Sequence, residues 1–184
     1  FITDRTSIII EPKIQFSSVF SSDRTDEVPN RDSAEFRLDQ ANLFLNNQFQ
    51  GSDNIQKNDR INLGITSLAM TENLGDINFF IGQSQKVSGT QKNVTLANED
   101  RQSHIINSID WNPSEMYKFS WFSLYNHHNF KSDTSDFNFN GSFNGWSYSA
   151  NHKSVDGEFI SNNIDREELN LELSKNFSNW KTSY

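Results

Sequence analysis

Residues able to do chemistry are few and poorly grouped in this chain. His127 and His128 are adjacent in a polar stretch, but no carboxylate lies at the spacing of a metal site on a defined element. The absence of cysteine excludes a thiolate nucleophile, a cysteine-based zinc site and a disulfide. Serine is abundant, yet neither a Gly-x-Ser-x-Gly elbow nor a phosphate-binding glycine loop is present. We therefore expect no catalytic residue, no metal and no cofactor, and we predict that the protein is not an enzyme.

The composition narrows the class of protein. The 184 residues carry a formal net charge of −8, which disfavours nucleic acid as a partner. The longest apolar run, residues 8–10, is far shorter than the roughly 20 residues of a membrane-spanning helix, so a helical membrane protein is excluded. Aromatic residues make up 13% of the chain, too many for a solvated disordered segment. Abundant Asn and Ser favour strands joined by polar loops, and the missing initiator Met indicates a piece of a longer or processed polypeptide.

Apolar and polar residues alternate along most of the chain, which predicts strands with one apolar and one polar face. In 117–125, however, Phe122 and Leu124 break the alternation, and we expect either a bulge or a locally buried inner face there. On this pattern the side chains expected to face lipid are Ile61, Leu63, Ile65, Ile77, Phe79, Ile81, Phe137, Phe139, Leu169, Leu171 and Leu173.

Short and long connections alternate between these strands. Turn residues mark short connections at 72–75, 112–115, 144–145 and 178–179, and longer polar stretches lie near 21–58, 88–103, 126–134 and 152–165. A transmembrane barrel has this rhythm, because its periplasmic turns are tight and its extracellular loops are long. The aromatic residues beside the short turns would form the periplasmic girdle: Trp111, Tyr117, Phe143, Trp146, Phe177 and Trp180.

A soluble β-sandwich would also show alternation, but its strands are more often about 5–6 residues long. Several strands here span roughly 9–12 residues, the length that a tilted membrane strand needs. Counting from Ile8 gives about nine strands, and single-chain barrels have even numbers and no open edge. The predicted fold class is therefore all-β: residues 1–184 form one partial domain, an arc of a larger antiparallel transmembrane barrel.

Residues 8–87 contain a series of short motifs in one order. The motifs read E-P-x-x-Q, P-N-x-D-S, N-L-F, N-x-F-x-G-x-D, R-x-N-x-G and a closing G-Q. The residues that carry them are Pro12, Pro29, Asn30, Asp32, Ser33, Asn42, Leu43, Phe44, Phe49, Gly51, Asp53, Arg60, Gly64, Gly82 and Gln83. With these motifs the stretch resembles the barrel of the LptD family. The remainder, 88–184, is similar to the family only in its amphipathic strands and aromatic-flanked turns.

The resemblance implies that the chain passes lipopolysaccharide into the outer leaflet of a Gram-negative outer membrane. It also implies the partners: an LptE-like lipoprotein that plugs the barrel, a periplasmic bridge of Lpt proteins, and outer-membrane lipid. The family's lateral opening joins its first and last strands, which this stretch need not include, so no gate residues are assigned. The alternatives are a passive porin, which needs rings of inward charges, and a structural barrel or adhesin.

The long connection near 21–58 is too apolar to stay in water. Phe36, Leu38, Leu43, Phe44, Leu45 and Phe49 are spread along it. We expect residues 28–53 to fold back onto the barrel mouth or into the lumen. This loop would then be a structural cap on the extracellular opening, which we favour, or a lid over an exit path for lipid.

Overall fold

The computed structural model describes residues 2–3, 6–18, 34–35, 37–46, 49–50, 58–89, 102–157, 164–177 and 180–183. Ten strands form one antiparallel sheet in chain order, and two more pair with each other between β2 and β5. The strands are β1 (Ile2–Thr3), β2 (Thr6–Ser17), β3 (Ala34–Glu35), β4 (Phe49–Gln50), β5 (Asp59–Thr71), β6 (Gly75–Ser88), β7 (Ile105–Ser114), β8 (Tyr117–Tyr125), β9 (Ser132–Phe143), β10 (Trp146–Val155), β11 (Arg166–Phe177) and β12 (Trp180–Ser183). Within these ranges no helix is long and apolar enough to cross a membrane.

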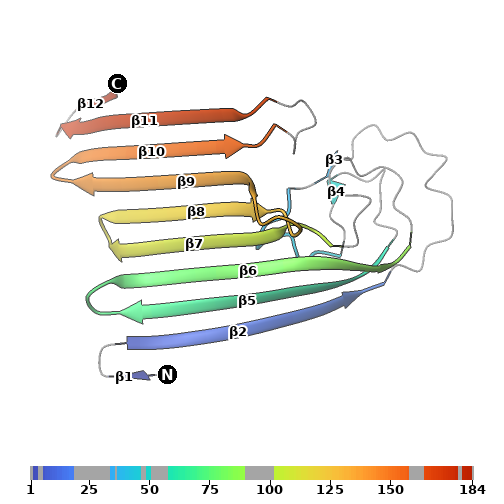
Figure 1. Ribbon diagram of the computed structural model, residues 1–184. Coiled ribbons are helices and arrows are strands. Elements are labelled where there is room, and N and C mark those ends of the chain that lie inside the picture. The colour runs from blue at the N-terminus through green and yellow to red at the C-terminus, as the bar shows by residue number, and fades with distance from the viewer. Residues whose placement is uncertain are drawn as a thin grey trace.

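The main sheet is a single layer in which each strand lies beside its neighbour in the chain (Figure 1). The eight strands β2 and β5 to β11 run 9 to 14 residues, longer than most strands of soluble sandwiches. Short strands β1 and β12 lie at opposite edges, so the described sheet is an open arc. The predicted all-β arc is confirmed. It has ten strands rather than about nine because β1, which precedes Ile8, adds a two-residue pair.

The connections follow the predicted rhythm. Figure 1 shows the short turns at one end of the sheet, here called the turn end, and the longer connections at the other, the loop end. Asn144 and Gly145 both have positive φ, 48° and 76°, as a two-residue hairpin turn requires. The predicted short connection at 178–179 lies outside the described residues.

One predicted turn is wrong in position. Residues 112–115 were expected to form it, but β7 continues to Ser114 and the turn is Glu115–Met116. The β7–β8 register shifts between Trp111 and Ser114, and this irregularity accommodates Pro113, which has no N–H for the ladder. The connection expected at 126–134 is likewise shorter, because β9 begins at Ser132.

The register divides the sheet into two faces. Residues 37–46 pack on one of them, here called the loop-covered face, and the other is called the apolar face. All eleven side chains expected to face lipid lie together on the apolar face, which confirms the predicted alternation. Phe122 and Leu124 lie on the loop-covered face, and β8 keeps a continuous register with β7 across them. The β8–β9 register does shift between Leu124 and Tyr125, but the extra residue, Asp133, is on β9. A locally buried inner face therefore explains the break in alternation within β8.

Candidate functional site

Residues 37–46 form a compact turn, here called the docked turn. Asp39 Oδ1 accepts hydrogen bonds from the backbone N–H groups of Ala41 (2.8 Å) and Asn42 (2.9 Å), and Leu43 N donates to Asp39 O (3.0 Å). The buried Asn42 side chain accepts from Asp39 N (2.8 Å) and donates to Arg37 O (2.7 Å). Asp and Asn side chains readily make such local bonds, and here they satisfy backbone groups that approach the sheet.

An apolar cluster holds the tip of the docked turn. Leu43 is 0% exposed and lies among Phe80, Ile106 and Leu124, which come from β6, β7 and β8. Leu38, Phe44 and Phe122 pack around this cluster. Burying one leucine side chain fully contributes about 1.5–3 kcal/mol. The buried core of the described residues therefore joins the turn to the sheet.

Two glycines make room for this packing. Gly64 and Gly82 face each other across β5 and β6 on the loop-covered face. A Cβ on Gly64 would lie 2.8 Å from Phe44 Cζ, and a Cβ on Gly82 would lie 2.6 Å from Leu43 Cδ2. Any larger residue at either position would overlap the docked turn unless the turn moved away.

A buried arginine binds the end of the docked turn. Arg60 is 1% exposed, and its Nη2 donates to the carbonyl oxygens of Leu45 and of Asn46, the latter at 3.0 Å. Its Nε and Nη1 have no hydrogen-bond partner in the part of the chain that the structure describes. A buried guanidinium is stable only when its donors are used, so the two loop carbonyls are important for keeping Arg60 in place.

A series of side-chain hydrogen bonds next to Arg60 connects β2, β5 and β6. Gln15 Nε2 donates to Phe44 O at 3.0 Å, and Gln15 Oε1 accepts from Asn62 Nδ2 at 2.9 Å. Asn62 Oδ1 in turn accepts from Ser84 Oγ at 2.6 Å. Together with Arg60, this series binds the carbonyl groups of residues 44, 45 and 46.

Charged side chains bind the docked turn to β2 and β9. Arg37 Nη1 pairs with Asp136 Oδ2 on β9 at 2.6 Å, and the Arg37 guanidinium lies 4.2 Å from the centroid of the Phe122 ring. On β2, Lys13 Nζ lies 4.3 Å from the centroid of the Phe44 ring. Partly exposed contacts of these kinds contribute about 0.2–1 kcal/mol each. The docked turn thus bridges β2 and β5 to β9.

The loop-covered face is polar toward β11. At its turn end a hollow of about 380 Å³ is lined by short polar and charged side chains, among them Lys118, Asn140, Ser149 and Glu172. Such a surface suits a hydrated or saccharide-bearing group better than an acyl chain.

The apolar face has a boundary that runs obliquely across the strands. On β2 its apolar side chains extend toward the loop end as far as Phe16, whereas on β11 they extend only to Leu169, which shares a hydrogen-bonding row with Ile10. The boundary thus drifts by about 20 Å along the strands over a sheet width of about 34 Å, an angle of about 30°. Strands of transmembrane barrels tilt by about 35–45°. A flat apolar layer crossed by tilted strands accounts for the drift.

Aromatic rings gather at the turn end of the apolar face. Trp111 stacks on Phe119 (5.1 Å between centroids), Phe119 on Phe139 (4.7 Å), and Phe139 lies 5.8 Å from Tyr148. Of the predicted girdle residues, those placed on this face are Trp111, Tyr117, Phe143, Trp146 and Phe177, and the side chain of Trp180 lies outside the described residues. The rings lie at the turn end of the apolar face, the position that an aromatic girdle has in a transmembrane barrel.

Comparison with known protein families identifies the family to which the chain belongs. The model of the LptD family, described as LPS transport system D, matches residues 3–182. The chain belongs to the LptD family. No curated protein matches it. Membership in LptD, a family of transport and assembly proteins, gives the chain a role in lipopolysaccharide transport. The match also covers 88–184, where the sequence resembled LptD only in style.

The structure brings several LptD motif residues together. In the N-L-F motif, Leu43 packs at Gly82, Phe44 packs at Gly64, and Asn42 lies beside them in the docked turn. The motif residue Arg60 binds the carbonyl groups of the next two residues, Leu45 and Asn46. Pro12 lies in β2 on the apolar face, and Gln83 lies on the same face, where its Nε2 donates to Ser103 O at 3.0 Å. Those outside the description are Pro29, Asn30, Asp32, Ser33, Gly51, Asp53 and the side chain of Phe49.

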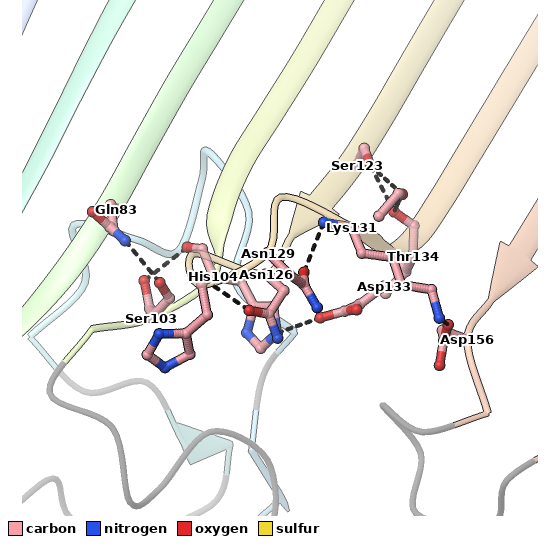
Figure 2. A network of polar contacts seen from close by, with 12 residues as sticks. Gln83, Ser103, His104, Ser123, Asn126, Asn129, Lys131, Asp133, Thr134 and Asp156 are labelled. Atoms are coloured by element: carbon pink, nitrogen blue, oxygen red, sulfur yellow. Dashed lines mark hydrogen bonds and ion pairs between the residues drawn. The ribbon is translucent and has the colours of Figure 1, made fainter.

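Sequence reasoning missed other partners. Asp136 was not singled out, although its position on the polar face of a predicted strand marked it as inward-facing. His104 was also missed. Its Nε2 lies 2.6 Å from Asp133 Oδ2, and both side chains are largely buried at the loop end (Figure 2). Nothing in the local sequence pairs residues 29 positions apart, so this contact had no usable signal.

Proposed function

We propose that this LptD-family chain is a partial barrel domain spanning residues 1–184 in a Gram-negative outer membrane. The barrel passes lipopolysaccharide from a periplasmic Lpt bridge into the outer leaflet. The turn end lies in the periplasm and the loop end at the cell surface. The observation that carries the proposal is the opposition of the two faces: an obliquely bounded apolar face for lipid, and a polar face partly covered by a docked turn.

The amphipathic cargo matches these two environments. The saccharide and phosphate part of lipopolysaccharide meets the polar face, while its acyl chains leave through a lateral opening between other strands of the barrel. No bond is broken, so no residue has a catalytic role. An LptE-like lipoprotein occupies the lumen of the complete barrel as its plug. A passive porin is the alternative, and its solute flux would be independent of the Lpt bridge.

The docked turn is a cap on the extracellular opening. Its support is the depth of docking: Leu43 is fully buried, and polar contacts fasten both ends of the turn. A lid that opens for each lipid is the competing role. It is favoured by Arg60, whose Nε and Nη1 have no partner among the described residues and would gain water when the turn leaves.

The test replaces residues 37–46 with a Gly-Ser segment of equal length in the full-length protein with its lipoprotein partner. For a cap, entry of large antibiotics rises while delivery of lipopolysaccharide to the surface continues. For a lid, delivery falls as well. Unchanged permeability and delivery would contradict both roles. Failure of the unaltered chain to deliver lipopolysaccharide in cells depleted of the resident protein would contradict the transport function itself.

A further inference from the structure

One hydrogen-bonding row on the apolar face changes character as it crosses the sheet. It begins with Pro12, Ile65 and Ile81 on β2, β5 and β6. It then becomes polar on β7 to β11. We call these five residues the polar row: Asn107, Ser123, Ser135, Ser154 and Glu167. The next row toward the turn end contains Ile109, Trp121, Phe137, His152 and Leu169. On β9 to β11 the polar row therefore lies just beyond the apolar layer, on its loop side. On β7 and β8 it lies at the edge of the layer, because Ile105 and Tyr125 follow it on the same face. The whole row points away from the docked turn.

Hydrogen bonds hold two members of the polar row, Ser123 and Ser135. Ser123 is fully buried, and its Oγ donates to Thr134 O (2.8 Å) and contacts Ser132 Oγ (2.8 Å) (Figure 2). Ser135 Oγ accepts the Trp121 indole N–H at 3.0 Å, so its hydroxyl proton can still be donated outward. Ser123 thus forms the floor, and Asn107, Ser135, Ser154 and Glu167 are partly or fully exposed. Because Ser123 and Ser135 are already held by hydrogen bonds, they lose little side-chain freedom when a ligand binds.

The chemistry of the row favours sugars over phosphate. It offers hydroxyl, amide and carboxylate groups, and none of its members carries a positive charge. Two basic side chains near it contact acids: His104 Nε2 lies 2.6 Å from Asp133 Oδ2, and Lys131 Nζ lies 2.5 Å from Asp156 Oδ2 (Figure 2). A third, His152, lies in the adjacent row of the apolar face. On the apolar face the rings of Trp121 and Tyr125 meet edge to face at 6.4 Å. Aromatic rings beside hydroxyl and amide groups suit a sugar ring, which has both apolar faces and hydroxyls.

We propose that the polar row binds the saccharide head of glycolipid in the leaflet around the barrel. The glycolipid meant is lipopolysaccharide already in the membrane, not the molecule in transit through the lumen. The proposal rests on the proposed orientation, which places the loop end in the outer leaflet. Continuity with the apolar layer argues for a lipid occupant, because acyl chains lying on the apolar face bring their head groups to this height.

The test uses the complete barrel with its lipoprotein partner in phospholipid nanodiscs. Three probes are titrated: lipopolysaccharide with its core saccharide, lipid A without the core, and additional phosphatidylethanolamine. Bound lipid per barrel is counted by native mass spectrometry. The variant Ser135→Leu/Ser154→Leu should bind core-bearing lipopolysaccharide about tenfold more weakly or worse, since two hydroxyl partners are lost. Phosphatidylethanolamine binding should not change. Ser135→Thr/Ser154→Thr keeps both hydroxyls and should bind like the unaltered barrel.

The matched control is Ser67→Leu/Ala69→Leu, which adds apolar bulk on the same face but within the apolar layer. It should leave lipopolysaccharide binding unchanged. Equal binding by the polar-row variant and the unaltered barrel, or an equal loss in the control, overturns the proposal. So does tight binding of lipid A that does not improve with the core saccharide, because phosphate would then be the ligand.

A second measurement avoids variants that fold poorly. A photo-crosslinking amino acid replaces Glu167 alone, which follows the end of the apolar layer on β11, or Ala69 alone near the turn end, in otherwise unaltered barrels in cells. Crosslinks to lipopolysaccharide are expected at 167 and not at 69, and phospholipid adducts alone at 167 overturn the proposal. A wrong transport function gives a different result, since the unaltered chain would then fail to deliver lipopolysaccharide whatever binds at the polar row.

Discussion

Replacing Leu43 with alanine should release the docked turn while leaving the sheet folded. Leu43 is 0% exposed and is enclosed by side chains from three strands. Truncating a buried leucine to alanine costs about 2–5 kcal/mol. Because the sheet strands remain paired without Leu43, this cost falls mainly on docking. The docking equilibrium should therefore shift by about 30-fold or more toward the open turn.

Trypsin provides the assay, because Arg37 lies within the turn and pairs with Asp136 only while the turn is docked. Cleavage after Arg37 in the purified full-length barrel should accelerate with the population of the open turn. Leu45→Ala is the matched control. Leu45 belongs to the same turn but is 45% exposed, so its truncation should cost below about 1 kcal/mol. Cleavage of Leu43→Ala at the rate of the unaltered protein, or equal acceleration by both variants, would refute the packing argument.

Three further predictions concern the wall of the barrel. Gly82→Val should raise antibiotic entry as strongly as replacing the docked turn, because its side chain would occupy the place of Leu43; normal entry would contradict this. Leu171→Arg should destabilise the barrel in urea titrations by about 2–4 kcal/mol if position 171 lies near the membrane midplane, whereas Glu172→Arg on the opposite face should cost far less. Epitope tags inserted after residues 93 and 162 should be reachable on intact cells, and a tag after Asn144 should not; exposure of the Asn144 tag would reverse the topology.

The sequence predicted features that depend on neighbouring residues. Alternation alone assigned Leu169, Leu171 and Leu173 to one face, because successive strand side chains always point to opposite faces. The Asn144-Gly145 turn was found for a similar reason, since positive φ at two consecutive positions strongly favours that pair. The expectation that the apolar loop packs back onto the strands is confirmed for Leu38, Leu43 and Phe44, whereas Leu45 is 45% exposed. The expectations for the side chains of Phe36 and Phe49 lie outside the described residues.

Features that depend on distant residues could not be predicted. Arg37 and Asp136 are 99 positions apart, and only the strand order brings them within 2.6 Å. The turn expected at 112–115 was misplaced for a related reason. Asn-Pro is a strong local turn signal, but pairing with β8 extends β7 through Pro113 and places the irregularity inside the strand. The roles of the motif glycines also needed the structure, because the chain that fills the space above them comes from a different segment.

The edges of the described sheet support a barrel more strongly than its faces do. On one side β2 pairs with β5 along its full length, but on the other β1 pairs only with Thr6 and Ser7. At the opposite edge β12 pairs with residues 174–177 of β11, so residues 166–173 are paired with β10 on one side only among the described strands. Both open edges lie beside apolar side chains such as Ile10, Ile14, Leu169 and Leu171. Each unsatisfied backbone group in lipid costs several kcal/mol, so a membrane position for this face requires both edges to be paired. The proposed membrane position of the apolar face therefore requires a partner for each open edge, as a closed barrel supplies.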